Sequence, residues 1–244
     1  MKSILLKEIR SFFSSLVGYI VIILFILISG LFMWILPDTN MFDYGYASLE
    51  KFFSFVPWIL IFLIPAITMR MLADEYKSGT IEMLSTKPLT ETSIILGKFW
   101  ASFFLVCICL LPTLLYILTL ESLAVTANNL DTGGILGSYI GLLFLISAFT
   151  AIGLFCSSLT DNQIIAFLIA VFLNFILFQG FESLSALPSF SGGLDYLVSQ
   201  LGLTFHYESI SRGVLDTRDL LYFASVSLLF IFATRLSLQK RKWS

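Results

Sequence analysis

Six apolar segments constrain the fold of this chain more than any other feature of its sequence. Each is at least 18 residues long, and a helix needs about 20 apolar residues to cross the hydrocarbon core of a bilayer. Their continuous hydrophobicity excludes a transmembrane barrel, whose strands alternate apolar and polar residues. The sequence therefore predicts an all-α polytopic membrane protein with six transmembrane helices. The predicted spans are residues 16–36, 52–69, 99–120, 135–159, 164–181 and 220–238.

The composition agrees with a membrane protein and narrows the possible partners. Hydrophobic residues make up 58% of the 244 residues and charged residues only 12%, against about a quarter in soluble domains. The net charge of −2 gives no reason to expect a nucleic-acid partner. Cys107, Cys109 and Cys156 all fall within apolar segments, so we expect buried thiols rather than disulfides or a metal site.

The lysine and arginine residues gather on one side of the predicted spans. If the N-terminus lies inside the cell, eleven of the fourteen fall on the inner side, as the positive-inside rule requires. We therefore expect both termini to be cytoplasmic and residues 1–244 to form a single transmembrane domain. The inner residues are Lys2, Lys7, Arg10, Arg70, Lys77, Lys87, Lys98, Arg235, Lys240, Arg241 and Lys242.

Residues 1–15 carry the pattern of a helix that lies flat in the headgroup region. Five apolar residues fall on one face at helical spacing, and Lys2 and Lys7 lie mostly off that face. A short cytoplasmic lead-in to the first span is the alternative. The apolar residues are Ile4, Leu5, Ile9, Phe12 and Phe13.

Residues 182–219 form a long final outer loop. Pro188 and the pair Gly192-Gly193 predict two short helices around a glycine turn. Because polar backbone at membrane depth must be shielded by protein, we place this segment as a re-entrant or interfacial hairpin at the outer face. His206, the only histidine, cannot build a metal site by itself, and we expect it at a polar surface.

Residues 70–98 form the largest predicted cytoplasmic element. The helix of the second span can continue past Asp74, and Gly79 should end it because glycine reaches the backbone angles that terminate a helix at little cost. Pro88 should stop a following helix, since the residue before a proline disfavours helical angles. The positions of Gly79 and Pro88 therefore predict a short helix of about two turns over residues 78–87.

The corner after this predicted helix is also marked, because Thr90 should cap the helix that climbs into the third span. A rigid helix held between two corners can pass the displacement of a bound partner to both neighbouring spans. An ordinary solvated loop with capping signals is the alternative.

The sequence of this loop contains short motifs, namely Ala73-Asp74-Glu75, Gly79-Thr80-Ile81-Glu82, Leu84, Thr86 and Pro88-Leu89. They resemble the permease subunits of ABC-2-type transporters, and the resemblance extends over essentially the whole chain. Residues 157–163 and 206–216 are most similar to the permease of the gliding-motility-associated ABC transporter. Permeases of copper-enzyme maturation systems contain similar sequence motifs.

The resemblance implies that residues 78–87 are a coupling helix that docks on a separate cytoplasmic ABC ATPase subunit. ATP and magnesium would bind to that partner, and a second permease subunit, identical or related, would complete the pathway in a bacterial inner membrane. The chain has no GxxxxGK[ST] loop, so we expect a transport subunit without a cofactor rather than an enzyme. The residues expected at the ATPase contact are Asp74, Glu75, Gly79, Thr80, Ile81, Glu82, Leu84 and Pro88.

Two other classes of protein remain open at this point. An ion-driven secondary transporter would need ionisable or broken-helix sites near the middle of the membrane, and five of the six spans carry no charge near their centres. A membrane scaffold that only anchors partners would tolerate changes at Gly79 or Glu82. The sequence does not identify a transported substrate.

Overall fold

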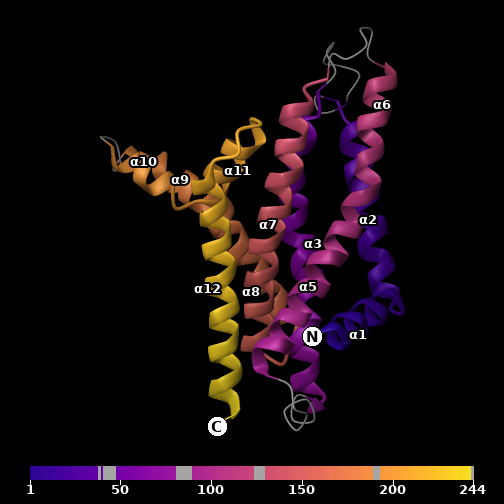
Figure 1. Cartoon of the computed structure of the whole chain (residues 1–244), viewed down its shortest axis with the longest axis vertical. Helices are drawn as coiled ribbons and strands as arrows, with labels where there is room; N and C mark the ends of the chain where they lie inside the picture. The colour runs from indigo at the N-terminus through magenta and orange to yellow at the C-terminus, as the bar shows by residue number, and fades with distance from the viewer. Residues whose placement is uncertain (38–39, 41–47, 81–89, 124–129, 189–192, 243–244) are drawn as a thin grey trace.

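The computed structural model describes residues 1–37, 40, 48–80, 90–123, 130–188 and 193–242. Six helices in this part of the chain are long and apolar enough to cross a membrane, and they run side by side along the long axis of the molecule (Figure 1). These residues contain no β-strand. The prediction of an all-α polytopic membrane protein is confirmed.

The positions of the long helices along the chain are close to those of the predicted spans. In chain order, the elements are α1 (Lys2–Phe13), α2 (Leu16–Trp34), α3 (Glu50–Lys77), α5 (Glu91–Leu110), the 3-10 turn η1 (Leu111–Leu114), α6 (Leu115–Leu123), α7 (Thr132–Leu159), α8 (Gln163–Phe175), the π-helical turn η2 (Ile176–Gly180), α9 (Phe181–Ser185), α10 (Leu194–Ser199), α11 (Leu203–Ser211) and α12 (Thr217–Lys242). Both termini lie toward the same end of the molecule (Figure 1). We call this the lower end, and it carries α1, residues 70–80 and residues 90–98.

The second and third spans extend beyond the predicted apolar segments at the lower end. Helix α3 continues eight residues past position 69, and α5 begins at Glu91 rather than at residue 99. The apolar pattern marks only the hydrophobic part of each helix. Helix propensity and capping residues extend both helices into the neighbouring polar residues. In the third span, Pro112 lies in η1, which separates α5 from α6.

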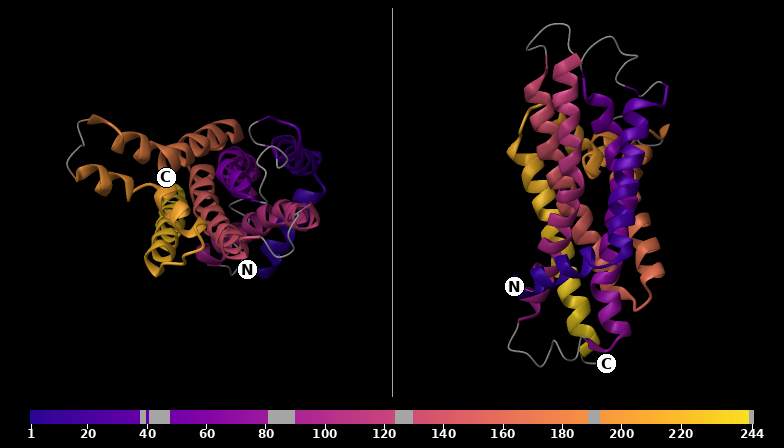
Figure 2. Two further views of the ribbon diagram at one scale, coloured as in Figure 1. Left: turned by 90° about the horizontal axis from the view of Figure 1, so that it is seen from above. Right: turned by 90° about the vertical axis from the view of Figure 1, so that its right-hand side faces the viewer.

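Helices α3 and α7 form the centre of the bundle, and the view from above shows the other spans around them (Figure 2). Their membrane-spanning windows are 61% and 72% buried, against 17% for α12. Gly153 lets the two central helices approach closely. A Cβ built on Gly153 would lie 2.2 Å from Thr68 Oγ1 and 3.0 Å from Thr68 Cβ, so a glycine is required at this crossing.

The small residues at the upper end of α7 receive α11. A Cβ on Gly137 would lie 2.7 Å from the carbonyl oxygen of Ile210, and Gly141 packs against the side chains of Ile210 and Tyr207. Tyr207 also donates a hydrogen bond to the carbonyl of Phe53 on α3, at 2.8 Å. These contacts hold α11 against both central helices.

The long final loop contains more helix than predicted. Helices α9 and α10 pair with each other as the predicted hairpin and project sideways from the bundle (Figure 1), and Gly193 begins α10 with a φ of 105°. Helix α11 was not predicted. The placement of the hairpin at the membrane surface stays a prediction.

The expectation of a surface position for His206 is wrong. The residue is 9% exposed, its Nδ1 lies 2.7 Å from Asp219 Oδ1, and its Nε2 lies 2.9 Å from the carbonyl oxygen of Gln200. The ring also stacks on Tyr222 with centroids 3.9 Å apart. The contact with Asp219 joins α11 to α12. The polar neighbours of His206 in sequence gave no sign that this face of α11 packs on α12.

We expect Gly153→Ala to destabilise the fold by about 1–3 kcal/mol, because the added methyl group collides with a β-branched side chain on α3. Thermal unfolding of the purified protein in detergent measures this as a lower Tm. Gly30→Ala is the matched control, since the nearest atom to its Cβ is Tyr116 Oη at 4.0 Å. Equal Tm values for the two variants would contradict the close approach of α3 and α7.

Candidate functional site at the lower end of the bundle

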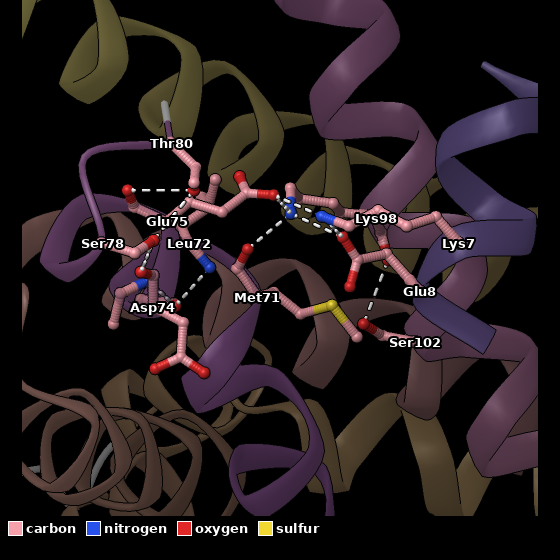
Figure 3. A network of polar contacts seen from close by, with 12 residues as sticks. Lys7, Glu8, Met71, Leu72, Asp74, Glu75, Ser78, Thr80, Lys98 and Ser102 are labelled. Carbon is pink, nitrogen blue, oxygen red and sulfur yellow. Dashed lines mark hydrogen bonds and ion pairs between the residues drawn. The ribbon is translucent and has the colours of Figure 1, made fainter. Parts of the chain in front are cut away.

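The buried ammonium group of Lys98 is the centre of the charged network at the lower end. Lys98 is 1% exposed, and its Nζ lies 2.8 Å from Glu8 Oε1, 2.8 Å from Glu75 Oε1 and 2.6 Å from the carbonyl oxygen of Met71 (Figure 3). An ammonium group has three donors, and here all three have acceptors. A buried charge is tolerated only when it is paired in this way, so Lys98 on α5 binds α1 and α3 together.

Lys7 completes the network from its solvent side. Its Nζ lies 3.0 Å from Glu75 Oε1 and 3.4 Å from Glu8 Oε1, and its side chain is 58% exposed. Partial burial lowers the pKa of Lys7, but the hydrogen bond to Glu75 and the charges of both carboxylates outweigh it and raise the pKa above 10.5. A raised pKa stabilises the fold below the ordinary lysine value and ceases to do so as the pH rises through the folded value. Lys7 is therefore charged and stabilising at neutral pH.

Apolar contacts hold α1 beside this network. Helix α1 lies across the lower part of the bundle (Figure 1), and its placement in the headgroup region stays a prediction. Ile4 is buried against Gly97 of α5, where a Cβ would lie 3.1 Å from the Ile4 side chain. Ile9, Phe12 and Phe13 pack against the main core.

Hydrogen bonds connect the described ends of the 70–98 segment to three further helices. Ser157 Oγ on α7 accepts from the backbone N–H groups of Leu72 and Ala73, at 3.0 and 3.1 Å, and donates to the carbonyl of Met69 at 2.9 Å. Asp74 accepts a hydrogen bond from Gln163 at the start of α8. At the other end of the segment, Glu91 accepts from Gln239 of α12 at 3.1 Å.

The corners predicted for the 70–98 segment are present wherever the structure describes them. Helix α3 ends at Lys77, Gly79 adopts a φ of 66°, and Ser78 Oγ lies 2.9 Å from Thr80 Oγ1. Thr90 caps α5 by accepting from the backbone N–H of Ser93 at 3.3 Å.

The rest of the predicted coupling helix lies outside the described residues. Four of the residues expected at the ATPase contact belong to that stretch, namely Ile81, Glu82, Leu84 and Pro88. The helix predicted for residues 78–87 is described only at Ser78, Gly79 and Thr80.

The described residues of the predicted ATPase contact divide into two groups. Gly79 and Thr80 are exposed, whereas Asp74 is half-buried against α8 and Glu75 is 6% exposed within the Lys98 network. A direct contact of these four residues with an ATPase stays a prediction. The structure adds that Glu75 faces α1 and α5, and that its carboxylate connects them.

Glu8 and Lys98 belong to this charged network, but reasoning from the sequence did not assign them to a site. Lys98 entered only the prediction of orientation, Lys2 and Lys7 were predicted to lie mostly off the apolar face of residues 1–15, and Glu8 was given no role. One signal could have identified Glu8, because it lies midway in the i, i+4 series Ile4, Glu8, Phe12 on that face. A carboxylate in an apolar helical stripe indicates a buried cationic partner.

The fold, with six long apolar helices and a charged segment between the second and third, is that of a multi-pass membrane protein. Residues 36–201, more than half of the chain, match the family described as ABC-2 family transporter protein, and the chain belongs to that family. The match supports a permease subunit, as the resemblance of the loop motifs implied, and says nothing of the gliding-motility subtype. The search of curated proteins finds no match.

We expect Lys98→Met to lower the stability of the protein by about 3–5 kcal/mol, because it removes the buried cation and leaves both carboxylates with only the exposed Lys7 as a counter-charge. Thermal unfolding in detergent checks this, with Lys2→Met as the control at an exposed lysine of α1. Combining Lys98→Met with Glu8→Gln and Glu75→Gln should restore part of the loss, since the neutral amides need no counter-charge. If the triple variant is less stable than Lys98→Met, the charges do not act as one network.

Proposed function

We propose that this chain is the permease subunit of an ABC-2 transporter in a bacterial inner membrane, with its lower end in the cytoplasm. Residues 70–98 would receive the movement of a separate ATPase subunit that binds ATP and magnesium. The observation that carries the proposal is the connection of this segment to the rest of the bundle. Its described ends contact α1 through Lys98 and Glu75, and α7, α8 and α12 through hydrogen bonds.

These connections support a mechanical role for the segment. Closure of an ATPase pair would move the segment, and the buried ion pairs would carry α1, α3 and α5 along as a unit. The two permease conformations must differ in their affinity for the two ATPase conformations, because docking without that difference shifts no equilibrium. A second permease subunit, identical or related, would complete the pathway.

The resemblance of residues 157–163 and 206–216 favours a system for gliding motility or for export linked to the cell envelope. A copper-enzyme maturation system is the alternative within the same family. A secondary transporter is disfavoured, because the spans described here carry no Asp, Glu, Lys or Arg near their centres. A scaffold would bind partners at the lower end without transmitting movement.

The orientation can be tested with single cysteines in a background free of Cys107, Cys109 and Cys156. Thr80→Cys and Asp216→Cys place exposed thiols at the lower and upper ends of the bundle, respectively. We expect a membrane-impermeant maleimide to label Asp216→Cys in cells with a permeabilised outer envelope, and Thr80→Cys only after the inner membrane is opened. Labelling of Thr80→Cys in the intact inner membrane would overturn the proposal.

The coupling can be tested at Gly79, where φ is 66° and a Cβ would contact nothing within 4 Å. Gly79→Pro cannot adopt this φ, whereas Gly79→Asn can at a small cost. The two variants therefore alter the same position but differ in whether they keep its backbone conformation. We expect an ATPase subunit to co-purify with the wild type and with Gly79→Asn. In Gly79→Pro it should be lost, or its ATP hydrolysis should no longer respond to the permease. A permease that co-purifies with no nucleotide-binding chain would contradict the proposal, and unchanged coupling in Gly79→Pro would favour the scaffold.

A further inference from the structure

A cavity of about 870 Å³ lies at the upper end of the bundle, at the opposite end from the Lys98 network. It is bounded by the first turns of α3 and α7, by η2 and α9, and by α11. Its volume is within the range of small-molecule sites, which is about 300–1,000 Å³. Neither the family match nor the proposed coupling assigns a role to it.

The wall of the cavity combines aromatic surface with negative charge. Trp58, which is 40% exposed, supplies the accessible aromatic surface, whereas Phe53 and Phe178 also line the cavity but are each only 3% exposed. Four carboxylates and one guanidinium line the cavity, for a formal charge of −3. The charged residues are Glu50, Asp131, Glu182, Glu208 and Arg212.

Most of this negative charge is not neutralised within the described part of the chain. Asp131 is occupied as the N-cap of α7, where it accepts from the backbone N–H of Gly134 at 3.0 Å. Glu50, Glu182 and Glu208 form no ion pair with a described residue. Burial and the neighbouring charge of Glu182 raise the pKa of Glu208, and Arg212 offsets this only in part. A cation in the cavity would relieve the repulsion between these carboxylates.

The arrangement of the carboxylates does not suit a metal ion. The described residues contain no group of three or more His, Cys, Asp or Glu side chains that could hold one. Dispersed carboxylates beside the exposed ring of Trp58 instead match a large, weakly hydrated cation, whose charge interacts with both the carboxylates and the ring face.

We propose that this cavity binds an organic cation with an apolar body. Such a molecule would place its apolar groups against Trp58 and its charge between Glu182 and Glu208. The inference concerns binding to the permease alone, so it holds or fails independently of ATPase coupling.

The test measures binding of tetraphenylphosphonium to the full-length purified protein by isothermal titration calorimetry, with empty micelles subtracted. Tetraphenylborate is the matched control ligand, because it has the same four phenyl groups and the opposite charge. We expect saturable binding of one tetraphenylphosphonium per chain and at least tenfold weaker binding of tetraphenylborate. Equal affinities, or no saturable binding of the cation, would overturn the proposal.

Matched variants locate the site. Glu182→Gln and Glu208→Gln should each weaken tetraphenylphosphonium binding roughly fivefold, the effect expected for removing one charge near the ligand. Trp58→Ala should weaken it as well, by removing aromatic surface. Glu121→Gln, an exposed carboxylate of α6 outside the cavity, should leave binding unchanged. If the cavity variants keep the wild-type Tm and the wild-type affinity, the cation binds elsewhere and the proposal is wrong.

Discussion

The lower end of the bundle depends on one buried ammonium group. Lys98 is 1% exposed, and its charge is compatible with that burial only while Glu8, Glu75 and the carbonyl of Met71 surround it. Together with Lys98 on α5, these groups come from α1 and α3. If any of the three helices moved away, an unpaired charge would remain on the other two. The position of α1 follows from this electrostatic requirement as much as from its apolar face.

The two central helices join the lower network to the upper cavity. Helix α3, whose 28 residues span about 42 Å, begins at Glu50 in the wall of the cavity and carries Glu75 of the network near its other end. Helix α7 runs in the opposite direction, from the turn at Gly134 beside the cavity to Ser157 against the end of α3. Gly153 packs these two helices closely against each other.

The local features of the fold could be predicted from the sequence because each depends on a few neighbouring residues. The apolar segments identified all six spans, Gly79 and Thr90 marked real corners, and residues 2–13 form a helix. The helix ends were less accurate, since α3 and α5 both extend into polar sequence that hydrophobicity does not detect. The contact of residues 74–88 with an ATPase stays a prediction, and one of the residues expected there, Glu75, faces the interior of the bundle.

The sequence by itself determined that this chain crosses a membrane six times and carries a charged, tightly cornered segment between its second and third spans. Hydrophobicity, backbone preference and capping are properties of short stretches, so they can be read along one chain. Only the tertiary structure decided that Glu8 and Glu75 meet at Lys98, that His206 is buried against Asp219, and that carboxylates from α3, α9 and α11 share one cavity. These residues are far apart in sequence, and which of them meet depends on how the helices pack around α3 and α7.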